Sequence, residues 1–433
     1  MLTTPDEVNR HYLEHVVATS QTHRVEASED ILAGNGMKLL AKGAQIDANV
    51  QERLLAHKLR KPLEDCIVVQ GGVTDRLAQA AEELLASNES LHHLCSQHAA
   101  DAPAVLRKLK LSPAVQSLLT VYCEHRADKL HHAVTVFLLT TSLTRKIVPS
   151  HADQLPSLML AALLHDVGEL YIDPAFLAKG VRLAPEQWRH IVTHPIVAHR
   201  LLKDMHGAGK VVAEAVLQHH ERLDGFGYPQ RLSGDKLPLN GQILAASEML
   251  VGLIESAPQP LSRAAIAMKL IPGEFGRSFI DIVATASHAE RLSGSTLDMT
   301  GVLQANLPRV QRIAATLQRY QLGQPVLVKQ MAGMSEKVRP IIAQGLDRLK
   351  SIQIAFSSTG MDATDEDLMA HLSQQPDSAL QLELTTILRE IEWRLRELER
   401  ESMLRADLAS PAEAPMIKQM ITLLKGTAAP QGL

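Results

Sequence analysis

Histidines extend the apolar faces of helical segments in this chain, and this pattern constrains the fold more than any other feature. In GKVVAEAVLQHHE, Val212 and Val216 mark an apolar face, and His219 and His220 follow Val216 by three and four residues. Both imidazoles therefore point toward the interior of the predicted fold. Polar groups that are buried in this way need partners, because unpaired burial is costly.

The dipeptide His165-Asp166 repeats this pattern in LPSLMLAALLHDVGE. Both residues follow Ala162, by three and four positions, and extend an apolar segment into a polar end. Burying the Asp166 carboxylate without a partner costs several kcal/mol. Some group must therefore compensate the charge of Asp166.

Three further segments add polar groups to inward faces. The helical pattern at 121–145 places Asp128 and His132 four residues apart, so that both side chains reach one centre. Glu248 lies on the apolar face of the next predicted helix after the glycine-rich turn, and His194 precedes a proline in an N-cap-like position. Taken singly, each has an ordinary explanation as a hydrogen-bonded core residue or a solvated ion pair.

The convergence of these residues favours a metal centre. Five histidines and three carboxylates share at least four inward faces: His132, His165, His194, His219 and His220, with Asp128, Asp166 and Glu248. Mixed nitrogen and oxygen ligands suit two or three divalent ions, with iron or manganese preferred. No cysteine joins the set, which argues against a structural zinc site. Asp166 is the carboxylate that best fits a bridge between two ions.

Composition excludes several classes of protein. Of 433 residues, 45% are hydrophobic and 21% are charged, and the net charge of -4 gives no bulk basic surface for DNA. The three cysteines have no CxxC spacing and favour a reducing, cytoplasmic setting. The longest apolar run, LMLAALL at 158–164, is too short for a membrane span. The composition predicts a cytoplasmic protein that binds neither DNA nor membrane.

The chain is predicted to be mostly α-helical and to have five parts. A small mixed α/β module of unreadable role comes first, with a hairpin turn at Gly34-Asn35-Gly36 and a strand at 66–70. The expected boundaries are 1–72 for this module, 73–119 for a helical connector, 120–290 for an all-α catalytic core, 291–425 for a helical C-terminal region and 426–433 for a disordered tail.

One C-terminal segment has heptad spacing. In residues 379–401, Leu384, Ile391 and Leu398 are seven apart, with leucines between them. The pattern covers only two to three heptads, fewer than a coiled coil needs. Packing against its own chain is the simpler interpretation, and a homodimer through this helix is the alternative.

Three motifs make the chain resemble the HD-GYP family, the metal-dependent cyclic di-GMP phosphodiesterases of the HD superfamily. They are HDVGELYIDP at 165–174, HPIVAHRLL at 194–202 and HHERLDGFGYP at 219–229, in the family's order and spacing. The resemblance covers roughly 120–290 and implies an HD-type helical bundle. It also implies attack of a metal-activated water on a phosphodiester.

The resemblance assigns roles residue by residue. It implies metal ligation by His132, His165, Asp166, His194, His219, His220 and Glu248, and by Asp128 in members with three metals. Asp166 and His165 are the predicted catalytic residues. The substrate pocket is predicted to contain Glu169, Asp224, Gly225, Gly227, Tyr228 and Pro229.

This chain departs from the family pattern at several positions. Glu169 stands where the family usually has lysine, which reverses a charge expected to face the substrate phosphate. Glu248 replaces the usual aspartate, Ala198 a glycine and Gln242 an arginine. The segment ESAPQP at 255–260 replaces the usual Arg-Pro-Tyr. Loss of these cations weakens the case for a doubly anionic dinucleotide.

Three functions follow from these observations. The first is hydrolysis of cyclic di-GMP or a related cyclic dinucleotide, supported by a competent ligand at every metal position. The second is hydrolysis of another phosphate ester, favoured by Glu169 and the missing arginines. The third is a non-catalytic signalling or scaffold protein, with a protein partner bound through the N-terminal module or the C-terminal helices.

Overall fold

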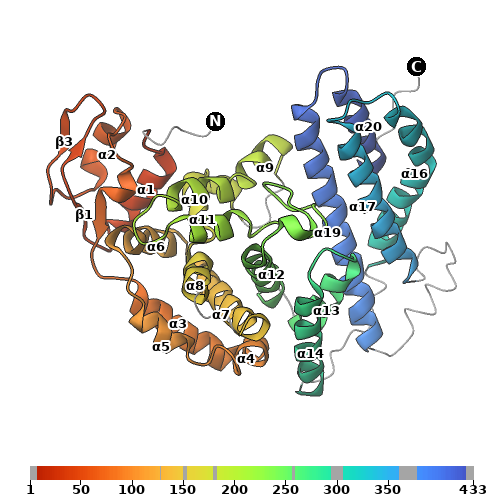
Figure 1. Ribbon diagram of the computed structural model, residues 1–433, viewed down its shortest axis with the longest axis horizontal. Coiled ribbons are helices and arrows are strands. Elements are labelled where there is room, and N and C mark those ends of the chain that lie inside the picture. The colour runs from red at the N-terminus through yellow and green to blue at the C-terminus, as the bar shows by residue number, and fades with distance from the viewer. Residues whose placement is uncertain are drawn as a thin grey trace. The chain divides into compact units, whose positions relative to one another are not determined.

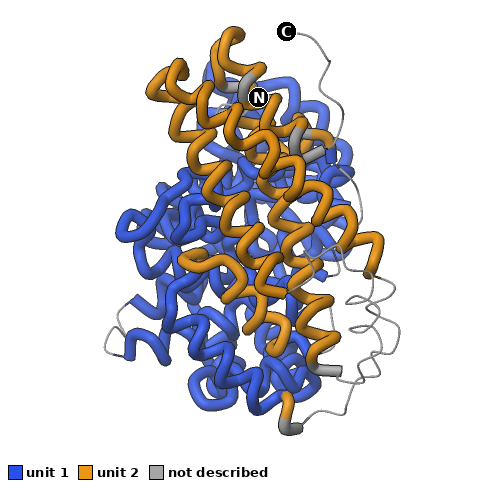
Figure 2. Tube along the Cα trace, turned by 90° about the vertical axis from the view of Figure 1, so that its right-hand side faces the viewer, with its two compact units in different colours: residues 1–183, 190–260, 275–290 blue, residues 184–189, 261–274, 291–433 orange. Residues whose placement is uncertain are grey.

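A computed structural model describes residues 7–126, 128–149, 154–178, 183–255, 259–293, 306–359 and 378–425. The chain divides into two compact units (Figure 2). Unit 1 comprises residues 1–183, 190–260 and 275–290, and unit 2 comprises 184–189, 261–274 and 291–433. Two short segments from the predicted catalytic region therefore cluster with the C-terminal helices. The predicted disordered tail, 426–433, lies outside the described residues.

The N-terminal part of unit 1 is the mixed module expected from the sequence. Its elements are α1 (Arg10–Thr19), β1 (Val25–Ala27), β2 (Ile31–Leu32), β3 (Lys38–Leu40), α2 (Ala48–Leu55), η1 (Leu63–Asp65) and β4 (Ile67–Val69). Strand β1 pairs antiparallel with β4, and β2 with β3. The β2–β3 turn contains Gly36 at a φ of +86°, a backbone conformation that glycine adopts without strain. The predicted hairpin is confirmed.

Helices make up the rest of unit 1, which confirms the mostly α-helical fold (Figure 1). They are α3 (Thr74–Ser87), α4 (Glu89–Cys95), α5 (Ala102–Lys108), α6 (Pro113–His125), α7 (Lys129–Ile147), α8 (Leu155–Leu164), α10 (His194–Leu202), α11 (Lys210–Leu217), α12 (Leu239–Ile254) and most of α14 (Arg277–Ser293). Short turns η2 (Val167–Tyr171), η3 (Pro174–Phe176) and η4 (Gly234–Lys236) connect some of them. Helix α7 packs against α3, α8 and α12, and so lies at the centre of the unit.

Two sequence-based boundaries are wrong. The helix expected over 121–145 is broken, because α6 ends at His125 and α7 begins at Lys129 with Arg126 extended between them. Asp128 caps the start of α7, although its carbonyl still accepts a hydrogen bond from the His132 amide at 3.0 Å. His194 is the first residue of α10 rather than its cap, which is Thr193.

Unit 2 is a helical bundle. It contains α16 (Leu307–Met331), α17 (Arg339–Ser357), α19 (Ser378–Leu408), α20 (Ala414–Lys425), most of α13 (Pro260–Leu270) and part of α9 (Pro185–Ile191). The heptad residues of α19 pack within this unit. Leu384, Leu388 and Ile391 share a buried cluster with residues of α16 and α17. The apolar stripe of α19 therefore packs against its own chain, as the simpler interpretation of the heptads predicted.

None of the helices in the described part of the chain is both long enough and apolar enough to cross a bilayer.

Candidate metal centre

The predicted ligands lie mainly at helix ends in unit 1. His132 is in the first turn of α7, His165 and Asp166 follow α8, His194 begins α10, and His219 and His220 follow α11; only Glu248 lies in the middle of a helix, α12. Their ligand atoms form two groups, each within 4.8 Å. The first group is Asp166, His194, His219 and His220, and the second group is His132, His165 and Glu248.

Carbonyls at helix C-termini orient three of the histidines. The Nδ1 atoms of His165, His194 and His219 lie 2.8, 2.7 and 2.5 Å from the carbonyl oxygens three residues earlier. Those carbonyls belong to the last turns of α8, α9 and α11, where the helix offers no amide four residues on; the Val216 carbonyl also accepts the His219 amide at 3.4 Å. Because a carbonyl can only accept, each Nδ1 carries the proton, and in the neutral ring Nε2 is left as a ligand.

Ring nitrogens within each group face one another. Nε2 of His194 lies 3.0 Å from Nε2 of His219, and Nε2 of His132 lies 3.2 Å from Nε2 of His165. In neutral rings with protonated Nδ1, two Nε2 lone pairs at this distance cannot bond each other. Between His194 and His219, whose Nδ1 atoms both face carbonyls, a positive charge, either a proton or a metal ion, would satisfy both nitrogens.

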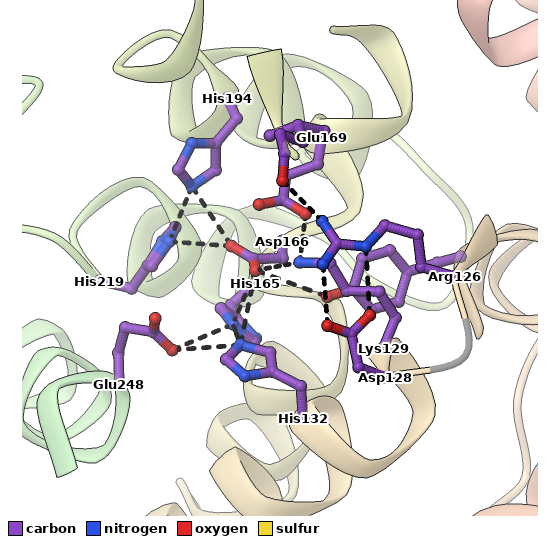
Figure 3. A network of polar contacts seen from close by, with 12 residues as sticks. Arg126, Asp128, Lys129, His132, His165, Asp166, Glu169, His194, His219 and Glu248 are labelled. Carbon is purple, nitrogen blue, oxygen red and sulfur yellow. Dashed lines mark hydrogen bonds and ion pairs between the residues drawn. The ribbon is translucent and has the colours of Figure 1, made fainter. Parts of the chain in front are cut away.

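Asp166 links the two groups, as Figure 3 shows. Its Oδ1 atom lies 3.3 Å from Nε2 of His194 and 3.5 Å from Nε2 of His219. Its Oδ2 atom lies 3.5 Å from Nε2 of both His132 and His165. The side chain is buried, so these interactions are little screened by water. One oxygen faces each group, which is the geometry of a bridging carboxylate.

Glu248 supplies the second group with its own carboxylate. Its Oε2 atom lies 3.4 Å from Nε2 of His132 and 3.3 Å from Nε2 of His165. Among the described residues this buried oxygen has no hydrogen-bond donor. On the other side of the His132 ring, Nδ1 lies 3.6 Å from a carboxylate oxygen of Glu255. Sequence reasoning missed Glu255, which is the first residue of the segment that departs from the family pattern.

The two groups differ in charge state. At His132 burial disfavours the charged ring, but the charge of Glu248 and the contact with Asp166 outweigh it and raise the pKa to about 12. Burial is likewise outweighed at His165, where Asp166 helps to raise the pKa to about 9. In the first group burial prevails and lowers the pKa of His219 to about 4. A metal ion in the second group would therefore displace protons.

Asp128 lies outside both groups. Its two carboxylate oxygens accept hydrogen bonds from Arg126, at 3.1 Å from Nε and 2.8 Å from Nη2. The guanidinium is held in turn by the carbonyl of Leu177, 3.0 Å from Nη1. Asp128 therefore turns toward Arg126 (Figure 3).

Glu169 lies beside Asp166 and is paired with a lysine. The Nζ atom of Lys129 forms ion pairs with Glu169 and, at 3.2 Å, with Oδ2 of Asp166. Lys129 is buried, and its Nζ lies 5.5 Å from the ring centroid of buried Tyr122. Lys129 is not among the predicted site residues. Its spacing of three residues before His132 could have pointed to it, because residues three apart share a helix face.

The HHERLDGFGYP loop is held by a buried carboxylate. Glu221 is fully buried and accepts the backbone N–H groups of Gln230, Arg231 and Leu232 at 2.6, 3.0 and 3.0 Å. Gly227 packs against the backbone of Glu221 so closely that a Cβ at position 227 would collide with the Glu221 Cα. Glu221 therefore anchors the chain that follows the loop. The sequence does not indicate this role, because Glu221 directly follows two predicted ligands.

The remaining predicted pocket residues shape this loop. The Tyr228 ring stacks on His220 with centroids 4.6 Å apart, and the peptide from Tyr228 to Pro229 is cis. Asp224 accepts a hydrogen bond from the Phe226 amide at 3.1 Å, and Gly225 has a φ of +79°. Tyr228 is therefore the loop residue that directly contacts a predicted ligand.

A second glycine brings two motifs together. A Cβ on Gly168, two residues after Asp166, would collide with the carbonyl oxygen of His194. The side chain at this position must therefore be absent for η2 to approach α10. Ala198 is fully buried at the same contact, and its amide nitrogen lies 3.1 Å from the point that a Cβ on Gly168 would occupy.

Comparison with known proteins supports an HD domain. Residues 113–282 match the family model described as HD domain. The 3'3'-cGAMP-specific phosphodiesterase 3 of Vibrio cholerae is 27% identical over 229 residues, covering 50% of this chain and 49% of that protein. The cyclic di-GMP phosphodiesterase response regulator RpfG of Xanthomonas campestris is 34% identical over 100 residues, covering 23% of this chain and 26% of that protein.

Two further proteins were matched. The cyclic di-GMP phosphodiesterase of Thermotoga maritima is 28% identical over 166 residues, covering 37% of this chain and 45% of that protein. The solved structure of Bd1817, an HDG"Y"P protein from Bdellovibrio bacteriovorus, covers 63% of this chain and 94% of that chain at 19% identity, with a TM-score of 0.33. The chain spans about half or less of the length of the curated relatives it matches.

Proposed function

We propose that the chain is a metal-dependent phosphodiesterase acting on a cyclic dinucleotide, because residues 113–282 match an HD domain and the matched relatives are named as phosphodiesterases of cyclic dinucleotides. The first and second groups would each hold one divalent ion, with Asp166 shared between them. This shared carboxylate is the observation that carries the proposal. The paired oxygens and facing ring nitrogens are the geometry that two adjacent cations need.

The donor set fits iron or manganese. One ion would have three imidazoles and Oδ1 of Asp166, and the other two imidazoles, Glu248 and Oδ2 of Asp166. Neutral nitrogens mixed with carboxylates suit both metals. Asp128 would serve a third ion only after leaving Arg126, so two ions are proposed.

The side chains divide the remaining work. Bound divalent ions would lower the pKa of a water molecule and polarise the phosphodiester oxygens. Asp166 would fix the spacing of the two groups, and the backbone carbonyls would keep Nε2 of His165, His194 and His219 directed at the centre. Glu221 would hold the Tyr228 loop over the first group.

The substrate is proposed from the relatives and tested by turnover. The matched proteins are named for cyclic di-GMP or 3'3'-cGAMP, so both dinucleotides belong in the assay. Protein loaded anaerobically with Fe²⁺ or Mn²⁺ is expected to linearise at least one of them, and the Asp166→Ala variant is not. Equal rates for the two proteins would reject the proposal.

Hydrolysis of another phosphate ester is the second candidate, favoured by the anionic Glu169. Replacing Glu169 by lysine alone would place two ammonium groups side by side, because the Lys129 ammonium group already contacts the side chain of residue 169. The double variant Lys129→Met/Glu169→Lys avoids that repulsion. Activity on cyclic di-GMP that appears only in the double variant, with the unmodified protein active on another ester, would favour this candidate.

The proposed setting is the cytoplasm. Cys66, Cys95 and Cys123 are all buried and unpaired, which suits a reducing compartment.

A further inference from the structure

We infer that Lys129 makes the two metal sites unequal, by weakening divalent-cation binding at the second group while leaving the first group nearly unaffected. The inference rests on the proposed metal centre and concerns the role of one residue in it. Lys129 does not contact the substrate in this proposal; it acts as a positioning residue through Asp166.

The two oxygens of Asp166 have different partners. Oδ2 lies 3.2 Å from Nζ of Lys129 and 3.5 Å from the hydroxyl of Tyr122, which donates to it. Oδ1 faces Nε2 of His194 and His219. The lone pairs of Oδ2 are therefore shared with two buried donors before any cation binds, and this is the oxygen that faces the second group.

Lys129 is held where it exerts this effect. Its side chain is 8% exposed, and it lies between Asp166, Glu169 and the face of Tyr122. The Glu169 carboxylate balances the ammonium charge, so that Lys129 is stable in a buried position. Without Glu169, the whole hydrogen-bonding capacity of the ammonium would be directed at Asp166.

Two effects lower the affinity of the second group. A carboxylate oxygen that accepts a hydrogen bond from an ammonium group has less electron density to give to a metal ion. A buried positive charge beside that oxygen also repels a dication, and burial reduces the screening. The first effect acts through Oδ2, and the charge of the second lies against the same oxygen, so both are expected to be greatest at His132, His165 and Glu248.

Metal titration of the apo protein tests the inference. Binding of Mn²⁺ is followed by calorimetry and by electron paramagnetic resonance, at one fixed pH. His194→Ala and His132→Ala variants assign the binding steps to the first and second groups. We expect Lys129→Met to tighten binding at the second group by about tenfold, within the range that outer-shell changes usually produce. The first group should change by about twofold or less, since it does not share Oδ2.

Two matched variants serve as controls, one expected to weaken Mn²⁺ binding at the second group and one expected to leave it unchanged. Glu169→Gln should weaken the second group, because Lys129 then pairs with Asp166 alone. Arg145→Met makes the same charge change near the other end of α7, where Arg145 pairs with Asp101, and should leave both groups unchanged. If Lys129→Met is poorly folded by circular dichroism, Lys129→Gln replaces it and should shift the second group in the same direction.

Three results would overturn the inference: equal shifts at both groups in Lys129→Met, no shift at the second group, or no binding at either group. Equal shifts would mean that the lysine acts only through long-range charge. Two distinguishable binding steps without turnover of any phosphodiester would instead reject the proposed function and leave the inference standing.

Discussion

Two buried charge clusters, one in each unit, differ in how completely their polar atoms are paired. In unit 2, Glu274 is 1% exposed and accepts hydrogen bonds from Arg348 Nη2 at 2.9 Å and Arg394 Nη2 at 2.5 Å. Arg394 also bonds the carbonyl of Ala267 at 3.0 Å and the carboxylate of Glu390 at 2.7 Å. Each oxygen of Glu274 therefore meets a donor.

The cluster around Asp166 in unit 1 lacks this complement. Ring nitrogens face ring nitrogens, and the buried Oε2 of Glu248 has only the His132 and His165 ring nitrogens nearby, at 3.4 and 3.3 Å, without a hydrogen bond among the described residues. Buried polar groups are normally satisfied, so an incomplete set indicates a missing partner. The arginine cluster is interpreted as structural, and the histidine cluster as a binding site.

Asp166→Ala should give the largest effect on function. The substitution removes an oxygen from both groups, so binding of both ions should fail. Metal ions contribute several kcal/mol to catalysis, so turnover should fall by about 10³-fold or more. Retention of two-site metal binding by calorimetry would contradict the shared role of Asp166.

Glu274→Gln should have the opposite effect, on the fold rather than on function. It leaves Arg394 and Arg348 buried without their shared counter-ion, which should cost about 3–5 kcal/mol of unfolding free energy. Chemical denaturation of the full chain measures the loss. Replacing Glu274, Arg348 and Arg394 together by methionine should recover most of it, and failure to recover would show that packing matters more than charge pairing.

Metal loading should stabilise the protein only through the histidine cluster. Free Mn²⁺ at 100 times its dissociation constant is expected to add about 2.7 kcal/mol relative to protein in a chelator. Calorimetric melting with and without metal measures the shift. The Glu274→Gln variant should keep this shift and Asp166→Ala should lose it; any other combination would show that the clusters are not independent.

Glu221 is a buried carboxylate whose hydrogen-bond donors are backbone amides and not charged side chains. Glu221→Ala removes the acceptor of three N–H groups, and the unsatisfied groups should cost about 1–3 kcal/mol or more. Glu221→Gln keeps one acceptor oxygen, so its free energy of unfolding should fall by less. Urea denaturation compares the two variants, and equal losses would argue against the hydrogen bonds.

The smallest effect is expected from a histidine pair outside both clusters. The rings of His15 and His125 meet with Nδ1 atoms 3.0 Å apart, and burial lowers their pKa values to about 4 and about 3. The charged and titratable neighbours of the pair are Glu14, His11, Lys129, Arg126 and Asp128.

The sign of the pH effect follows from these pKa values. Below about pH 6.5 these two histidines bind protons in the unfolded chain but stay neutral in the folded protein. The free energy of unfolding therefore falls as the pH drops toward 4. Because both imidazole rings are partly exposed to solvent, this change in the free energy of unfolding should be small. Denaturation at pH 7.5, 6 and 5 should show a shallower loss in His15→Gln/His125→Gln, and an unchanged slope would assign the pH dependence to other groups.

The sequence was informative where position along a helix decides direction. His219 and His220 lie in one group with Asp166, and the two oxygens of Asp166 face the two groups. Boundaries were less well predicted, since the break at Arg126 depends on its pairing with Asp128 and the carbonyl of Leu177. Local periodicity contains no signal for such a contact.

Sequence alone therefore determined the helical class, the residue types of the proposed site and the order of the motifs, because spacing sets which side of a helix a residue occupies. Only the tertiary structure decided what each charge faces. It paired Glu169 with Lys129 and Glu274 with two arginines through contacts between separate helices or turns, and it turned Asp128 toward the nearby Arg126. The physical reason is that the effect of a buried charge depends on its neighbours in space, which the order of residues does not specify.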